Sequence, residues 1–555
     1  MIAAVARFAR AALLPGLLGI AASAAELRPP PAWLEQAVFY QIYPQTYADS
    51  DGDGIGDLRG IIQKLPYLHD LGVTGIWLNP CFVSPFRDAG YDVADFYRVA
   101  PRYGTNDDLH ALFAEAKRLG IHVMLDLVAA HTSDQHPWFR ESQRAAKNKY
   151  TDWYIWTAGV GQLFAPNQQV VVGTAERSAN YIASFYSCQP ALNYGYAKPD
   201  PTQPWQQRID APGPLAVRAE LKNIMRFWFD MGASGFRVDM AGSLVKNDPD
   251  GTATAALWRE FREWMDREYP DKAMVSEWSE PHIAIPQGFH MDFLLQWTKP
   301  GYASVIRENG GQPAIFDRRG TTPFRKFLTE FEPLLAATRG KGYMALHTGN
   351  HDTTPRFGNG RDARDLVVAH AFLLTMPGVP FIYYGDEIGM RSPPFTVNKE
   401  GGYERTPART PMQWDASPGA GFSTAAPERF YLAIDPSPDR PNVAAQLTDA
   451  TSPLRAVQRF IALRRAHPAL AASGDFRALL ADIGQPIVYL RANASERVLV
   501  ALNPTDRAVT GELPTEIDVR GATVLDGEAH TLHPAGSRSR IELPAVSYTI
   551  IRLAQ

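Results

Sequence analysis

The sequence predicts an α/β fold: a (β/α)8 TIM barrel with a subdomain inserted after the third strand and a C-terminal all-β sandwich domain. Three observations predict it. Short apolar, β-branched runs alternate with longer amphipathic stretches from Val38 onward. A long segment rich in Tyr, Asn, Gln and Pro interrupts this alternation after the third run. Beyond Ala466, short alternating segments separated by turn residues replace it.

Eight runs are predicted to be the barrel strands, because each is short and apolar and ends in polar or charged residues. They are Val38–Pro44, Val73–Pro80, His122–Val128, Gly235–Met240, Met274–Trp278, Phe289–Leu295, Tyr343–Asp352 and Pro380–Glu387. Apolar residues recur three and four apart in the predicted helices Asp107–Leu119, Leu215–Met231, Thr254–Glu268, Asp362–Leu374 and Pro453–Ala466. Eight such units favour a barrel over a doubly wound sheet, which normally has fewer strands and often a glycine-rich phosphate loop.

The domain boundaries follow from where the pattern changes. About eighty residues separate the third strand from the next helix, against the few expected of a loop. We therefore predict an inserted subdomain over residues 133–212, standing over the mouth of a barrel formed by residues 33–132 and 213–470. Residues 471–555 are predicted to be the sandwich domain, with strands such as Ile487–Arg491, Arg497–Asn503 and Ser547–Leu553.

The N-terminus has the pattern of a secretory signal peptide. Arg7 and Arg10 precede an apolar run, Ala11 to Ala22, that is too short to span a bilayer comfortably. The run ends in an Ala-Ser-Ala cleavage signal, so residues 1–24 are predicted to be removed from an exported protein, periplasmic or secreted. The alternative is an N-terminal membrane anchor, but we expect no stable anchor. Export would permit one disulfide between the two cysteines, Cys81 and Cys188.

Composition restricts the class of partner. The net charge is -4, and no Lys/Arg-rich block is present, so no nucleic-acid partner is expected. Aromatic residues make up 11% of the chain and include 12 Trp, whose faces can pack in a core or stack on sugar rings. The sequence indicates no oligomeric state.

Polar residues fall at the ends of several predicted strands, where the catalytic groups of a (β/α)8 barrel lie. They are Asp92, His131, Arg237, Asp239, Glu277, His351 and Asp352. The mouth would hold the three carboxylates Asp239, Glu277 and Asp352. This suits glycosidic cleavage, in which one group protonates the leaving oxygen and another attacks or stabilises the anomeric carbon. The alternative is a set of structural salt bridges.

These stretches resemble the α-amylase superfamily, glycoside hydrolase family 13. The family's four short regions appear as Asp126-Leu-Val-Ala-Ala-His131, Gly235-Phe-Arg-Val-Asp239, Val275-Ser-Glu277-Trp278 and Gly349-Asn-His-Asp352. The resemblance implies that Asp239 is the nucleophile, Glu277 the general acid/base, and Asp352 a third carboxylate that distorts the bound sugar.

The resemblance also implies the residues that bind the substrate, a small or oligomeric α-glucan. Arg237 would hold the nucleophile ionised, since residues two apart on a strand point to one face. His131 and His351 would bind hydroxyls of the first sugar. Asp92 and Arg356 would form a pair that grips the terminal glucose and closes the cleft, as in exo-acting glucosidases, and Tyr91 would offer a flat face. A salt bridge without a ligand role is the alternative for that pair.

An Asp-rich loop follows the first predicted strand. Its spacing matches the first nine positions of an EF-hand loop, although Gly60 stands where the bidentate Glu would be. We expect one structural Ca2+ there, held by Asp49, Asp51, Asp53, Asp57 and the backbone of Ile55. The alternative is a solvated acidic turn. The loop resembles the branch that holds oligo-1,6-glucosidases, trehalose synthases and α-glucosidases.

Four functions remain open on the sequence. The chain is predicted to be a retaining glycoside hydrolase acting on malto-oligosaccharides or short α-glucosides. The alternatives are a glucosyltransferase or isomerase of the trehalose synthase type, an endo-acting α-amylase, and a non-catalytic sugar-binding protein. The three intact carboxylates argue against the last. Met240 stands where this branch often has Val, Ala or Thr, so the residues do not indicate a linkage preference.

Overall fold

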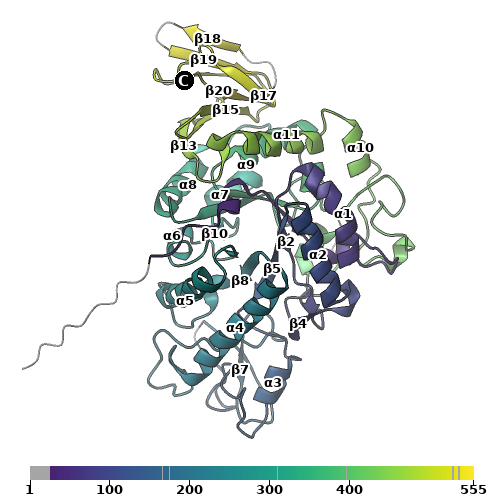
Figure 1. The fold of residues 1–555 in the computed structure, drawn as a ribbon, viewed down its shortest axis with the longest axis vertical. Coiled ribbons are helices and arrows are strands. Elements are labelled where there is room, and N and C mark those ends of the chain that lie inside the picture. The colour runs from purple at the N-terminus through teal and green to yellow at the C-terminus, as the bar shows by residue number, and fades with distance from the viewer. Residues whose placement is uncertain are drawn as a thin grey trace, which may run out of the picture.

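The computed structural model describes residues 26–165, 167–173, 175–308, 311–394, 397–527, 531–535 and 538–554. The predicted signal peptide, residues 1–24, lies outside the described residues. The remaining chain forms a barrel, a subdomain at one end of the molecule and a pair of sheets at the other (Figure 1).

Eight parallel strands close into a barrel in the order β1-β12-β11-β10-β9-β8-β5-β2. Their bounds are β1 Phe39–Ile42, β2 Gly75–Leu78, β5 His122–Val128, β8 Gly235–Asp239, β9 Ala273–Ser276, β10 Met291–Phe293, β11 Tyr343–His347 and β12 Val379–Tyr383. Six of the strands lie within the predicted runs, and the other two, β9 and β12, each begin one residue earlier than predicted. The predicted (β/α)8 barrel is confirmed.

Large side chains fill the inside of the barrel. Phe39 stacks on Phe381 with ring centroids 4.5 Å apart, and Phe293 packs edge-on against Phe381 at 4.7 Å. Gly75 makes room for this layer, because a Cβ there would lie 2.6 Å from the Phe39 ring. The interior is therefore a packed core, and only the polar residues at the strand ends remain available for chemistry.

Helices surround the barrel, as Figure 1 shows. They are α1 Leu58–Leu71, α2 Asn106–Arg118, α4 Pro212–Met231, α5 Thr252–Glu268, α6 Pro281–Ala284, α7 Pro300–Ile306, α8 Arg325–Thr338, α9 Ala363–Thr375, α10 Val443–Thr448 and α11 Pro453–Ala466. Local sequence sets their ends: α2 begins with a capping box between Thr105 and Asp108, and α1 ends at Gly72 in the left-handed conformation.

The chain between β5 and α4 forms the inserted subdomain, with α3 Pro137–Ser142, β6 Gln169–Val171 and β7 Tyr181–Ala183. It is tied to the barrel end of β5, since Leu192 donates its N–H to the Ala130 carbonyl at 3.0 Å and the Tyr194 hydroxyl donates to Ala129 at 2.7 Å. A two-stranded sheet, β3 Phe82–Val83 and β4 Asp95–Val99, lies in the loop after β2. Cys81 and Cys188 are both free, so the disulfide that export would permit is not found.

The C-terminal domain contains a five-stranded and a three-stranded antiparallel sheet. The strands are β13 Asp475–Leu480, β14 Ile487–Ala492, β15 Arg497–Asn503, β16 Val509–Glu512, β17 Thr523–Gly527, β18 Thr531–Ala535, β19 Arg538–Leu543 and β20 Ser547–Arg552. Apolar residues of both sheets, such as Leu499 and Ile541, share one buried cluster, which is the core of a sandwich.

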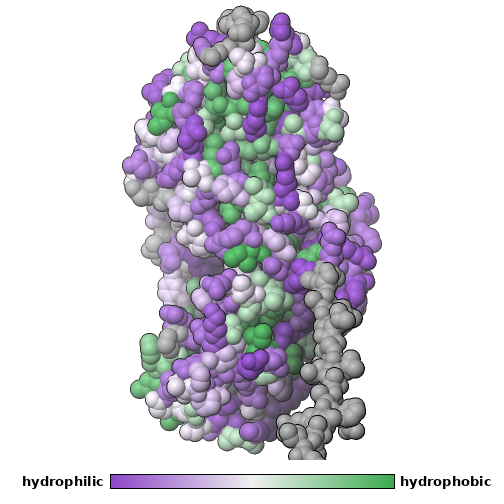
Figure 2. All heavy atoms as spheres, turned by 90° about the vertical axis from the view of Figure 1, so that its left-hand side faces the viewer, coloured by the Kyte–Doolittle hydropathy of each residue, from purple (hydrophilic) through white to green (hydrophobic). Residues whose placement is uncertain are grey.

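The surface of the molecule mixes polar and apolar residues. On the face seen in Figure 2, apolar residues lie in groups among polar ones. Over the residues that the structure describes, no helix has both the length and the apolar character needed to cross a bilayer.

Arg491 joins the sandwich to the barrel, and this contact predicts a stability effect. Its buried guanidinium donates to the carbonyls of Thr375 and Ala471, the latter at 2.7 Å. We expect Arg491→Leu to lower the free energy of unfolding by about 2–4 kcal/mol, because buried carbonyls lose their donors. Calorimetry against Arg477→Leu checks this: Arg477 is half exposed and pairs with Glu516, so its loss is expected to cost under about 1 kcal/mol. Equal losses would contradict the assignment.

Candidate active site

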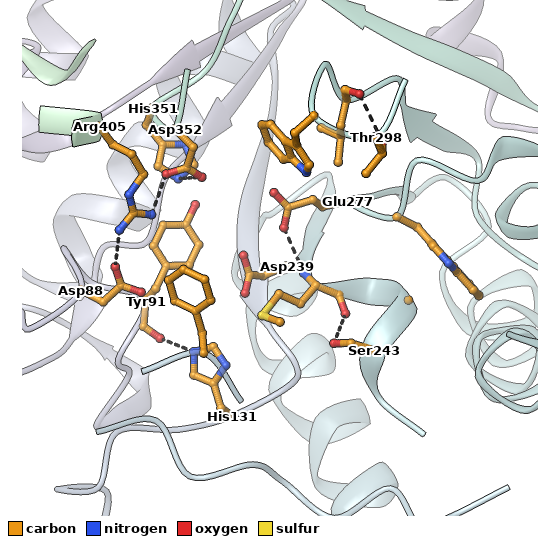
Figure 3. Close-up of a pocket in the computed structure, with 16 residues that line it drawn as sticks. Asp88, Tyr91, His131, Asp239, Ser243, Glu277, Thr298, His351, Asp352 and Arg405 are labelled. Atoms are coloured by element: carbon orange, nitrogen blue, oxygen red, sulfur yellow. Dashed lines mark hydrogen bonds and ion pairs between the residues drawn. The ribbon is translucent and has the colours of Figure 1, made fainter. Parts of the chain in front are cut away.

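A cavity of about 530 Å³ lies at the carboxyl ends of the barrel strands. Figure 3 shows side chains pointing into it from opposite walls, with Asp239 and Glu277 on one side and Asp352 and Arg405 on the other. The residues that line it are Asp88, Tyr91, His131, Phe185, Asp239, Met240, Gly242, Ser243, Glu277, Trp278, Leu295, Trp297, Thr298, His351, Asp352 and Arg405.

One buried arginine holds the two carboxylates that end neighbouring strands. Arg237 on β8 donates from Nη1 to Asp239 Oδ1 at 2.8 Å, and its Nη2 contacts Glu277 Oε1 at 2.6 Å. The same guanidinium donates to Asp126 Oδ1 at 2.6 Å. β8 and β9 pair in parallel register with Val238 opposite Ser276, so the next residue on each strand delivers its carboxylate to the same place. The predicted placement of Arg237 beside Asp239 is found.

Burial sets the protonation of this pair. Removal from water raises the pKa of Asp239, the charge of Glu277 raises it further, and Arg237 opposes both effects. Burial likewise raises the pKa of Glu277, with Asp352 adding to the shift and Arg237 opposing it. Two carboxyls that repel each other and share one cation titrate as a pair. Protonation of one carboxyl therefore favours the ionised form of the other.

Asp352 faces this pair from the loop after β11 and is strongly anionic. Arg405 and Arg409 each donate to its Oδ1 at 2.9 Å, and the Nε2 of His351 lies 3.2 Å from its Oδ2. Burial raises the pKa of Asp352, but the positive charges of Arg405 and Arg409 hold it well below its usual range. The site therefore combines a carboxylate that stays anionic with a pair of carboxyls whose titrations are coupled.

The two histidines are neutral hydrogen-bonding groups. His351 Nδ1 accepts from the side-chain amides of Gln41 at 3.0 Å and Asn79 at 3.2 Å, which leaves its proton on Nε2 beside Asp352. Tyr91 stacks on the His351 ring with centroids 5.2 Å apart. Burial lowers the pKa of His131 to about 4, and its Nε2 bonds the Tyr91 carbonyl at 3.0 Å. All three residues line the cavity, where they can bind sugar hydroxyls and a ring face.

The prediction that Asp92 and Arg356 form a pair that binds the terminal glucose is wrong. Asp92 is fully buried and accepts from Ser84 Oγ at 2.9 Å and from the Arg87 N–H at 2.9 Å, so it folds its own loop. Arg356 is also buried: it donates to the Tyr384 carbonyl at 2.7 Å and compensates the buried Asp386, 3.4 Å away. Neither residue lines the cavity, because each side chain is buried against the partners just named.

Asp88 and Arg405 instead form an ion pair in the wall of the cavity. Arg405 Nη2 lies 3.3 Å from Asp88 Oδ1, while its Nη1 bonds Asp352, as the dashed lines in Figure 3 mark. Asp88 also accepts from the Gln189 amide at 2.8 Å. Asp88 lies four residues before Asp92 in the same turn, so the Gly-Tyr-Asp pattern that drew attention to Asp92 could also have led to Asp88. Arg405 comes from a 3-10 helix, Tyr403–Arg409, that carries no recognised pattern.

The Asp-rich loop brings three of its four carboxylates together. Oxygens of Asp49, Asp51 and Asp57 all lie within 4.8 Å of one another, which fits the oxygen ligands of a divalent cation. Asp53 is not in this group; its Oδ1 accepts the Ile55 N–H at 2.7 Å. The predicted participation of Asp53 therefore has no support, and the Ca2+ itself stays a prediction. None of these residues lines the active-site cavity.

Comparison with known proteins agrees with the fold and the site. The model of the α-amylase catalytic domain matches residues 41–473. The oligo-1,6-glucosidase of Parageobacillus thermoglucosidasius is 32% identical, over 87% of this chain and 92% of that protein. The trehalose synthase/amylase of Mycobacterium tuberculosis H37Rv is 33% identical, over 85% of this chain and 82% of that protein. The chain belongs to the α-amylase family and is a glycoside hydrolase.

A solved structure matches over nearly the whole chain. The isomaltulose synthase of Erwinia rhapontici NX5, in complex with D-glucose, superposes with a TM-score of 0.78 at 27% identity. The match covers 95% of this chain and all of that one, so it includes the inserted subdomain and the C-terminal sheets.

The contacts of Arg405 predict a loss of catalytic efficiency. Arg405→Met removes the cation that joins Asp88 to Asp352, and we expect kcat/KM on a short α-glucoside to fall at least about a hundredfold, roughly 2.7 kcal/mol. Steady-state kinetics check this, with Arg87→Met as the matched control. Arg87 lies beside Asp88, pairs with Asp134 and does not line the cavity, so its loss is expected to change kcat/KM only a few-fold. If kcat/KM falls to a comparable extent in both variants, the loss comes from removing a positive charge near the cavity and not from the contacts of Arg405.

Proposed function

We propose that this glycoside hydrolase is a retaining, exo-acting enzyme that releases terminal glucose from short α-glucosides. The observation that carries the proposal is one cavity in which Arg237 joins Asp239 to Glu277, opposite an anionic Asp352 that is bound to Arg405. A retaining mechanism needs an ionised nucleophile and a protonated acid side by side, and two coupled carboxyls bound to one guanidinium can supply both forms.

In the proposed reaction Asp239 attacks the anomeric carbon. Glu277 donates its proton to the glycosidic oxygen, so the leaving sugar departs as an alcohol and a glucosyl ester forms on Asp239. Glu277, now ionised, takes a proton from water, whose oxygen attacks the anomeric carbon and breaks the ester bond. Asp352 remains charged throughout and lies where it can bind sugar hydroxyls and stabilise positive charge that develops on the ring.

The pair of Asp88 and Arg405 supports exo action. Its charged groups lie against Asp352 and present fixed donors and acceptors, which can bind a vicinal diol directionally. Tyr186 adds a hydroxyl 3.1 Å from Arg405 Nη2. A glucose bound between this group and the catalytic carboxylates would be a chain end. The relatives named as an oligo-1,6-glucosidase and a probable α-glucosidase agree with this proposal.

Glucosyl transfer is the second candidate function. It is favoured by relatives and solved structures named as trehalose, isomaltulose and trehalulose synthases. The same covalent intermediate serves both reactions, and the acceptor, water or sugar hydroxyl, decides between them. Product analysis on maltose, isomaltose, sucrose, trehalose and starch separates these two functions from an endo-acting amylase.

Three measurements test the proposed function. Proton NMR of the first product is expected to show α-glucose, because two inversions at the anomeric carbon restore its configuration. Asp239→Asn is expected to lower kcat at least about ten-thousandfold while the circular dichroism stays unchanged. A maltoheptaoside capped at its non-reducing end should resist cleavage. A first product of β configuration, or rapid cleavage of the capped substrate, would contradict the proposal.

We also propose a structural Ca2+ at Asp49, Asp51 and Asp57. Adding Ca2+ at about a hundred times its Kd is expected to stabilise the apoprotein by about 2.7 kcal/mol, and a chelator should reverse the change. Asp51→Asn is expected to abolish the response of the melting temperature, whereas Asp53→Asn should retain it, because Asp53 lies outside the group of three. Equal responses of the two variants would refute this ligand set.

Export is proposed from the N-terminal sequence alone. Removal of residues 1–24 would leave Ala25 as the first residue of the mature protein. N-terminal sequencing of the protein from the periplasm or the culture medium tests the cleavage site.

A further inference from the structure

The residue that follows Asp239 has an unusual backbone conformation. Met240 has φ 47° and ψ 37°, in the left-handed region that residues with a side chain rarely adopt. Such strained residues persist only where their surroundings hold them, and they cluster at functional sites. Met240 lines the active-site cavity, so the contacts that hold its conformation bear on catalysis.

Ser243 holds this conformation from the following turn. Its backbone N–H donates to the Met240 carbonyl at 3.0 Å, and its hydroxyl donates to the same carbonyl at 2.9 Å. Lys246 fixes Ser243 in turn, because its Nζ donates to the Ser243 carbonyl at 2.8 Å. The backbone of Lys246 is bonded to the inserted subdomain at Gly195, 2.9 Å away. The turn is therefore anchored on both sides.

The same turn is packed against the strand that carries Glu277. Gly242 lies under the indole of Trp278, the residue after Glu277, and a Cβ on Gly242 would come within 2.4 Å of that ring. Only glycine permits this approach. The spacing between the turn and the end of β9 is therefore fixed by direct contact.

In this left-handed conformation the Met240 N–H points toward the carboxyl group of Glu277. This N–H donates to Glu277 Oε2 at 3.1 Å, while Glu277 Oε1 contacts Arg237 at 2.6 Å. Both hydrogen bonds are dashed lines in Figure 3, one ending at the labelled Ser243 and the other at the labelled Glu277. Each carboxylate oxygen of Glu277 thus has its own donor, and the side chain has a single orientation.

We infer that Ser243 is a positioning residue for proton transfer by Glu277, acting through the backbone of Met240. The inference rests on the acid/base role of Glu277 in the proposed function. Because Arg237 occupies Oε1, the transferred proton resides on Oε2, and the Met240 N–H fixes the direction in which that oxygen faces. When Glu277 is ionised in the second step, the same N–H stabilises the charge.

Loosening the turn is expected to change the pKa of Glu277. A backbone N–H that donates to a carboxylate favours the ionised form and lowers the pKa, and this contact has that effect on Glu277. Without Ser243 the contact weakens and the pKa of Glu277 rises. The alkaline limb of the kcat/KM profile, which follows loss of the acid's proton, therefore moves to higher pH.

The test compares substrates that differ in their need for an acid. Ser243→Ala is assayed on maltose, whose leaving sugar needs a proton, and on 2,4-dinitrophenyl α-glucoside, whose phenolate leaves without one. We expect kcat/KM on maltose to fall about tenfold, which is only part of the contribution that a general acid makes. On the aryl glucoside we expect kcat/KM to fall less than about twofold. Ser243→Thr keeps the hydroxyl and is expected to restore the maltose rate and the pH profile.

A matched control removes a different hydroxyl from the cavity wall. Thr298 lines the cavity and donates to Ser279 Oγ at 2.7 Å, without contacting Met240 or Glu277. Thr298→Ala is expected to change the rates on both substrates by the same factor and to leave the alkaline limb in place. This outcome would separate the effect of Ser243 from a general loss of substrate binding.

Two results would overturn the inference: equal losses of Ser243→Ala on both substrates, or no loss on either. Glu277→Ala, assayed in parallel, separates this failure from that of the proposed function. If Glu277 is the acid, its loss affects maltose far more than the aryl glucoside. Equal losses for Glu277→Ala would refute the acid/base role itself.

Discussion

The buried ion cluster around Arg237 is the interaction on which the active site depends. One guanidinium, 1% exposed, contacts Asp126, Asp239 and Glu277 and lies over the Trp77 ring at 4.9 Å. Burying so much charge is unfavourable unless every group has a partner. The cluster therefore depends on the register of three neighbouring strands, which places Asp126 of β5 opposite Arg237 of β8 and Val238 opposite Ser276 of β9.

The rest of the cavity is built around this cluster from loops. Asp352 carries the permanent negative charge, and Arg405 and Arg409 hold it from a 3-10 helix far along the chain. The opposite wall is formed by the turn after Asp239, whose strained residue contacts Glu277. Both walls use groups that become neighbours only when long loops fold over the barrel mouth, which is where enzymes with this fold place their specificity.

The error at Asp92 and Arg356 has a physical cause. Both residues had suitable chemistry and lay near strand ends, but each is fully buried with its own partner. A buried charge binds the nearest group that compensates it, and the nearest group in a loop is set by the loop's path. Asp88, four residues away, has the same chemistry and an open side facing the cavity.

The sequence by itself determined the eight strands, the insert, the C-terminal sheets and the residues that end β8, β9 and β11. These follow from short-range rules: a strand of period two places Arg237 and Asp239 on one face, and parallel strands bring their carboxyl ends together. Only the tertiary structure decided which loop residues meet. The contacts between Asp88 and Arg405, between Ser243, Met240 and Glu277, and among three of the four loop aspartates depend on backbone paths. Such paths are fixed by packing between segments that are distant in sequence, and no local pattern encodes them.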